Sequence, residues 1–153
     1  AWEMLGTANF VGGLASRLPA PPLTHLTPSF RGVTIRDIEV EGCRMLVYVQ
    51  GIPESPAKHI LIENVWGDTR RDEAVSAYGH YKPSPKPYVI DMVDADGVTL
   101  RNFQVVTAKK QIRIVDVRNL TMEDLQIDCY GEELDVEISG EMTEHLKKVG
   151  CNF

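Results

Sequence analysis

Four segments of the chain share one pattern of apolar and polar positions, and they superimpose without gaps. Apolar residues fill the second, fourth and seventh positions of every copy and the ninth position of three copies. The copies are GVTIRDIEV (32–40), HILIENVWG (59–67), GVTLRNFQV (97–105) and NLTMEDLQI (119–127). Alternation with a period of two predicts strands, because a helix would place its apolar residues three and four apart. The sequence therefore predicts an internal repeat built from short β-strands.

The alternation changes phase once in each copy, at a pair of polar residues that ends in Asp or Asn. The second members of these pairs are Asp37, Asn64, Asn102 and Asp124. Asn and Asp tolerate the left-handed backbone conformation better than other non-glycine residues. We therefore expect a structural corner at these four residues, joining two strands that both point apolar side chains inward. A bulge within an ordinary strand is the alternative.

The spacing of the copies predicts how the strands are stacked. The shortest interval, from residue 97 to residue 119, leaves room for about three short strands and their turns, which is the size of one β-helix coil. Further strands are expected at 45–50, 88–93, 111–117 and 134–140. The longer intervals carry insertions rich in Pro, Gly and Ser at 51–59 and 69–87, which we expect to leave the stack as loops. An antiparallel β-sandwich is the alternative, although it does not require the same corner in every copy.

The chain is expected to form one domain over residues 1–153. A strand and a lead-in loop are predicted at 1–29, repeated coils at 30–140 and a C-terminal cap at 141–153. Within the cap, EMTEHLKKVG (141–150) is the segment of the chain that resembles a helix, so we expect a short C-terminal helix there.

Composition narrows the classes of function. Hydrophobic residues make up 43% of the chain and charged residues 25%, as in a globular protein. Sixteen Lys and Arg against 22 Asp and Glu give a net charge of -6. Phosphate binding needs clustered positive charge, so nucleic acid is not an expected partner. No apolar run reaches the roughly 20 residues of a membrane-spanning helix, so a membrane is not expected either.

The Cys and His residues give no metal or cofactor signal. Cys43, Cys129 and Cys151 are an odd number without the CxxC spacing of zinc or redox sites. They are expected to be buried thiols, and whether Cys129 and Cys151 pair is left open. The four His residues are scattered, and Asp91, Asp94 and Asp96 are expected on a solvated face or in a turn. The run Asp94-Ala-Asp-Gly97 is more typical of a turn than of a calcium site. We therefore expect neither a metal nor a cofactor.

Residues 27–128 resemble the late coils of the polygalacturonase family, glycoside hydrolase family 28, especially its bacterial branch. The resemblance rests on the Thr27-Pro-Ser-Phe30 lead-in, the corner patterns, the Gly51-Ile-Pro-Glu-Ser-Pro56 loop and the following coil at 95–105. It implies an all-β, right-handed, single-stranded parallel β-helix, the pectin-lyase-like solenoid. It also implies inverting hydrolysis of galacturonosyl linkages in pectic polysaccharides by aspartates, without a metal.

The family's catalytic motifs are missing from this chain. Its Asn-Thr-Asp, Asp-Asp and Gly-His-Gly motifs do not occur, Tyr78-Gly-His80 is followed by Tyr81, and Arg113-Ile-Val115 is not the family's Arg-Ile-Lys. We therefore expect the C-terminal scaffold of a polysaccharide-degrading enzyme, inactive by itself, with its catalytic coils and any export signal upstream. The partners implied are those coils and a pectic polysaccharide, and the parent protein would be secreted or periplasmic. The alternative is a free-standing β-helical module that binds carbohydrate or has a structural role.

Two sets of side chains are candidates for interaction. Tyr78, His80 and Tyr81 in the long insertion form an aromatic cluster together with Tyr88, and aromatic faces on loops commonly stack on sugars. They are the candidate substrate-binding residues, although covering the side of the stack is the competing interpretation. The residues just before the corners, Arg36, Glu63, Arg101 and Glu123, are expected to form an outward column of alternating charge.

Overall fold

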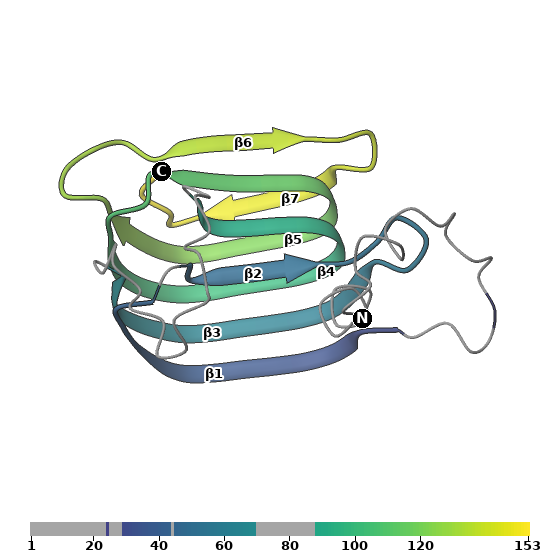
Figure 1. Ribbon diagram of the computed structural model, residues 1–153, viewed down its shortest axis with the longest axis horizontal. Helices are drawn as coiled ribbons and strands as arrows, with labels where there is room; N and C mark the ends of the chain where they lie inside the picture. The colour runs from purple at the N-terminus through teal and green to yellow at the C-terminus, as the bar shows by residue number, and fades with distance from the viewer. Residues whose placement is uncertain (1–23, 25–28, 44, 70–87) are drawn as a thin grey trace, which may run out of the picture.

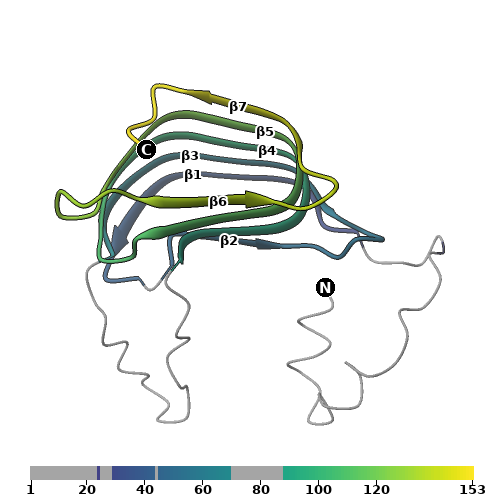
Figure 2. The ribbon, with the colours of Figure 1, turned by 90° about the horizontal axis from the view of Figure 1, so that it is seen from above.

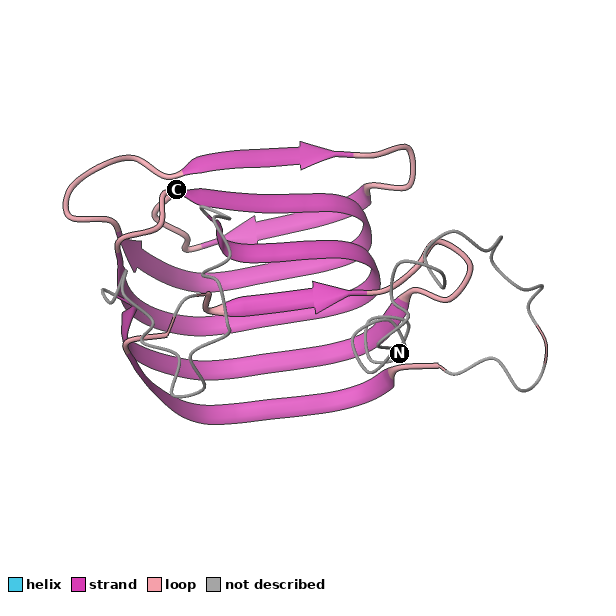
Figure 3. Ribbon diagram, viewed as in Figure 1, coloured by secondary structure: helices cyan, strands magenta, loops and turns pink. Residues whose placement is uncertain are grey.

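The chain is described by a computed structural model, which covers residues 24, 29–43, 45–69 and 88–153. These residues form an all-β structure in which Figure 3 shows strands and connecting loops but no helix. The strands are β1 (Arg31–Glu41), β2 (Val47–Gln50), β3 (Ala57–Thr69), β4 (Tyr88–Thr107), β5 (Gln111–Asp128), β6 (Asp135–Ser139) and β7 (Glu144–Val149). The expected all-β class is therefore confirmed for the described part of the chain.

The seven strands form one parallel sheet. Its main path runs β1-β3-β4-β5-β6, while β2 pairs with β4 and β7 pairs with β5. Figure 1 shows the strands stacked in this order, and Figure 2 shows β4 and β5 bending from the layer that contains β2 and β6 to the layer that contains β1, β3 and β7. Every pairing between these strands is parallel, so the antiparallel sandwich is excluded for the described residues.

The register aligns the four sequence copies residue by residue. Val33 pairs with Ile60, which pairs with Val98, and Val98 pairs with Leu120. The columns headed by Ile35, Ile38 and Val40 follow the same register. Glu63 pairs directly with Arg101, so the insertion before β4 adds no further strand between β3 and β4.

The apolar positions of the pattern form a continuous interior. In β4 and β5 they are almost completely buried, and the largest fully buried side chain is Phe103. The side chains of Leu100, Met122 and Leu125 lie in the same cluster. Burial of this kind contributes about 25 cal/mol for each Å² of apolar surface removed from water, so the two long strands provide most of the core's stabilisation.

The four corner residues all have left-handed backbone conformations, with φ of 57° at Asp37, 56° at Asn64, 53° at Asn102 and 54° at Asp124. Two further columns of left-handed residues were not anticipated. One contains Gly32, His59, Gly97 and Asn119, and the other contains Asp94, Asp116 and Gly140. The sequence carried a signal for the first of these columns, because its members occupy the first position of the four copies and two of them are glycine.

The predicted C-terminal helix is wrong. Residues 144–149 form strand β7, in which Leu146 pairs with Leu120. Residues 145–153 are a fifth copy of the pattern, with His145 (φ 54°) at the first position and Gly150 (φ 68°) at the corner. A Cβ on Gly150 would lie 2.2 Å from Oδ1 of Asp124, so any other residue there would have to displace that carboxylate and adopt a strained positive φ. The copy escaped detection because Lys148, opposite Met122, occupies a position that is apolar in the other copies.

Two smaller expectations also need correction. The predicted bounds of the insertions at 51–59 and 69–87 are wrong where they meet β3. Residues 57–59 and Thr69 belong to that strand. Asp91 was expected on a solvated face or in a turn, yet it is completely buried within β4. The other insertion residues, 70–87, lie outside the described residues, as does most of the segment expected as a strand and lead-in loop at 1–29.

Candidate functional site

The corner residues form a ladder of side chains along the outside of the stack. Nδ2 of Asn64 donates to Oδ1 of Asp37 at 2.8 Å, and Nδ2 of Asn102 donates to Oδ1 of Asn64 at 2.9 Å. The two bonds run in the same direction, so each amide is oriented by the one before it. Because these hydrogen bonds join left-handed residues of neighbouring strands, the ladder helps to align successive corners.

Beside this ladder lies an open hollow of about 410 Å³. Its wall includes three polar corner side chains and one aromatic residue. The lining residues are Asp37, Asn64, Val65, Trp66, Asn102 and Gln104. Trp66 has 43% of its surface exposed, and Gln104 is its partner in the next strand.

The outward column of alternating charge lies on the other side of the corners. Arg36, Glu63, Arg101 and Glu123 are aligned in that order by the register, as predicted. Nε of Arg101 lies 2.9 Å from Oε2 of Glu123, and its Nη1 lies 3.6 Å from Oε2 of Glu63. Hydrogen bonds from Lys147 and Arg101 lower the pKa of Glu123. Arg36 contacts Asp37 instead, at 3.6 Å.

A second charged group lies on the layer of β2 and β6. Arg113 approaches the buried Asp91 with both ends of its guanidinium group, Nε at 2.8 Å from Oδ1 and Nη2 at 3.0 Å from Oδ2. The ring of Tyr88 lies 4.8 Å from the guanidinium carbon. The hydrogen bond to Asp91 raises the pKa of Arg113, which keeps the guanidinium group protonated. A buried carboxylate is tolerated here because a two-pronged partner satisfies it.

Carboxyl groups gather at the corner column that contains Asp94. Burial raises the pKa of Asp94, and the negative charges of Asp116 and Glu54 raise it further. The carboxylate of Asp116 is engaged by the chain itself, because its Oδ1 accepts a hydrogen bond from the backbone N–H of Met142 at 3.0 Å. Within the described ranges no group of three or more His, Cys, Asp or Glu side chains could hold a metal ion.

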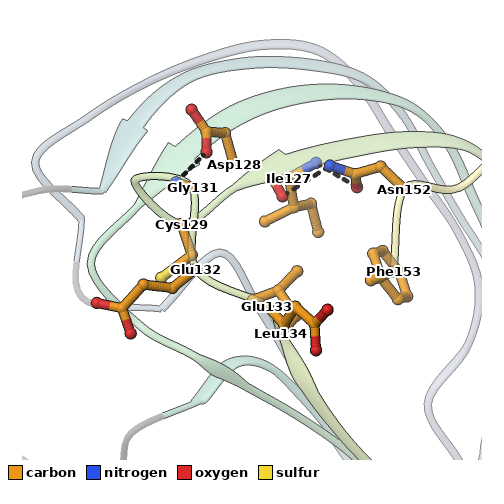
Figure 4. A pocket seen from close by; sticks show the side chains of 9 residues that line it. All are labelled: Ile127, Asp128, Cys129, Gly131, Glu132, Glu133, Leu134, Asn152 and Phe153. Atoms are coloured by element: carbon orange, nitrogen blue, oxygen red, sulfur yellow. Dashed lines mark hydrogen bonds between the residues drawn. The ribbon is translucent and has the colours of Figure 1, made fainter.

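A second hollow, of about 450 Å³, opens at the C-terminal end of the stack (Figure 4). Its apolar wall includes Leu134 and Phe153. Asn152 pairs with the backbone of Ile127, accepting from its N–H at 3.0 Å and donating to its carbonyl at 3.0 Å, as the dashed lines in Figure 4 show. Oδ1 of Asp128 accepts from the N–H of Gly131 at 3.1 Å. These polar groups already have partners in the chain, so this hollow is the end of the core with a polar rim.

The three cysteines are free thiols, so Cys129 and Cys151 do not pair. Burial raises the pKa of Cys43 and that of Cys129, which makes both thiols poor nucleophiles. The candidate substrate-binding residues Tyr78, His80 and Tyr81 lie outside the described residues. In the part of the chain that is described, no helix is long and apolar enough to cross a membrane.

Comparison with protein-family models, with curated proteins and with solved structures finds no match to this chain.

Proposed function

We propose that the described strands form a right-handed, single-stranded parallel β-helix, with coils that follow one another along the stack. The support is the register, which aligns successive copies of the repeat in chain order. The bends at left-handed corners further support a chain that winds round one core. Right-handedness follows from the strong general preference for right-handed connections between parallel strands of one sheet.

We further propose that this β-helix is the C-terminal scaffold of a polysaccharide-degrading glycoside hydrolase of the polygalacturonase type. The observation that carries this proposal is the gap-free alignment of the four copies in neighbouring strands, because the residues of these copies also carry the family resemblance. The parent protein would be secreted or periplasmic and would act on pectic polysaccharide.

The experiment compares the purified chain with the product of its complete natural coding sequence on polygalacturonate, and it measures released reducing ends. We expect no release by residues 1–153 alone, because inverting hydrolysis needs two carboxyl groups about 6.5–9.5 Å apart across the bond. The longer product, with Asp-bearing coils upstream, should release them. Turnover by the chain alone would contradict the scaffold role. Loss of that turnover in Asp94→Asn would then locate it at the carboxyl group with the raised pKa.

The alternative proposal is a free-standing β-helical module that binds carbohydrate. One observation favours it, namely the hollow in which an exposed tryptophan adjoins a row of side-chain amides. A complete coding sequence without Asp-bearing coils upstream would support this alternative over the scaffold.

A further inference from the structure

The hollow beside the corner ladder contains hydrogen-bonding groups that the described residues leave unused. Among the described residues, the side-chain amide of Gln104 and the indole N–H of Trp66 form no hydrogen bond. Asn102 uses one N–H of its amide to reach Asn64, which leaves its second N–H and its oxygen available. A ligand in the hollow would therefore meet both donors and acceptors.

The arrangement of these groups suits a sugar ring. An aromatic face can stack on the C–H groups of a pyranose, and a planar amide can donate to one hydroxyl while it accepts from the next. Trp66 and Gln104 are paired in adjacent strands, which lie about 4.8 Å apart in a sheet, a separation comparable with one sugar ring. The stacking group and the amide can thus contact a single residue of a saccharide.

The charge around the hollow selects among saccharides. Asp37 is the charged residue in its lining, and the whole chain carries a net charge of -6. A carboxylate brought beside Asp37 would be repelled, whereas hydroxyl groups would not. The chemistry therefore favours a neutral sugar over a uronic acid.

We propose that this hollow is a binding site for a neutral saccharide, with Trp66 stacking on one pyranose ring while the amides of Asn102 and Gln104 bind its hydroxyl groups. The site lies on the outside of the corners of β1, β3 and β4. It does not depend on whether the chain is part of a hydrolase, because it requires no reaction. A failure of this proposal therefore shows in binding, and a failure of the scaffold proposal shows in released reducing ends.

The test titrates the full chain with cellohexaose, xylohexaose and mannohexaose, and with hexagalacturonate as the charged comparison, using calorimetry. At least one neutral hexaose should bind. Trp66→Ala should weaken its binding about tenfold or more, and Gln104→Ala by a smaller factor, since the amide can be replaced in part by water. Trp66→Phe should keep most of the affinity because it retains an aromatic face.

Tyr130→Ala is the matched control, because Tyr130 is also an exposed aromatic residue but lies outside the hollow. It should leave binding unchanged, and thermal melts should show that the variants fold. If Trp66→Ala does not fold, Gln104→Ala and Trp66→Phe decide the matter by the same titration. The proposal is overturned if no neutral hexaose binds, if binding survives Trp66→Ala unchanged, or if hexagalacturonate binds more tightly than every neutral hexaose. It is also overturned if Trp66→Ala abolishes dimers seen by sedimentation, since the hollow would then be a contact between copies.

Discussion

Strands β1 and β4 carry the same nine-residue pattern, yet their apolar side chains have different surroundings. Leu100 of β4 is fully buried, whereas Ile35, at the equivalent position of β1, has 44% of its surface exposed. The difference arises because β4 has paired strands on both sides, β3 and β5, while β1 pairs with β3 alone in the described sheet. Burial in this molecule therefore depends on neighbours along the stack as well as on the apolar residue itself.

The same contrast holds for the charged column. Arg101, in β4, lies between Glu63 and Glu123 and contacts both. Arg36, in β1, has its ion pair with the adjacent Asp37. Within the described sheet, β4 thus has partners for its charged side chain on both sides, whereas β1 pairs only with β3. Native structure often opens locally where such contacts are few, so β1 is expected to open more readily than β4.

The largest effect is expected from truncating the equivalent apolar residues of the two strands. Leu100→Ala should lower the free energy of unfolding by about 3 kcal/mol, because it removes buried methyl groups and leaves a cavity. Ile35→Ala should cost about 1 kcal/mol, since much of its side chain is already in water. Urea denaturation followed by circular dichroism measures both values. Equal costs would show that β1 is covered as well as β4, and the comparison would then fail.

A smaller effect is expected at the corners. Asn102→Ala should cost about 1–2 kcal/mol, because alanine is strained in the left-handed conformation and the bond to Asn64 is lost. Asn102→Gly is the control for backbone strain, since glycine adopts positive φ freely. It should therefore cost less than alanine does. Asp37→Ala, at the corner of β1, should lower the free energy of unfolding by less than Asn102→Ala in the same urea experiment. The reason is that β1 opens locally in the native state, so its contacts contribute less to that free energy.

Much of the fold could be predicted because the repeat is local and regular. The strand pattern, the left-handed corners and the charged column all depend on residues within one copy, and the structure aligns them as expected. The burial of Asp91 was not predicted because it depends on a residue far away in the sequence. Asp91 is buried because Arg113 binds it from the next strand, 22 residues later. No periodicity within β4 reveals that partner.

The C-terminal copy was missed for a different physical reason. The inward position opposite Met122 is filled by Lys148, whose exposed side chain donates a hydrogen bond to the carbonyl of Phe153. The sequence did not predict the hollow either, because a corner residue and an exposed tryptophan, each taken alone, indicate only a structural role. Their proximity across β1, β3 and β4 becomes visible only once the register is known.

The smallest effect is expected from the exposed charged column when the pH is lowered. Hydrogen bonds from Lys147 and Arg101 hold the pKa of folded Glu123 below its ordinary value of 4.5. A lowered pKa in the folded state means that the contribution to stability is fully present above the unfolded value and is lost as pH falls through the folded value. The loss of stability should therefore be absent at pH 7 and appear below about pH 4.5.

The charged column can be tested directly by carbon-detected NMR titration, which should give a pKa for Glu123 that moves upward in Arg101→Gln. Arg36→Gln is the matched control in the outermost strand, and it should leave the titration of Glu123 unchanged, because two strands separate the residues. An equal shift in both variants would mean that the column acts through its total charge, and the distinction between inner and outer strands would not extend to electrostatics.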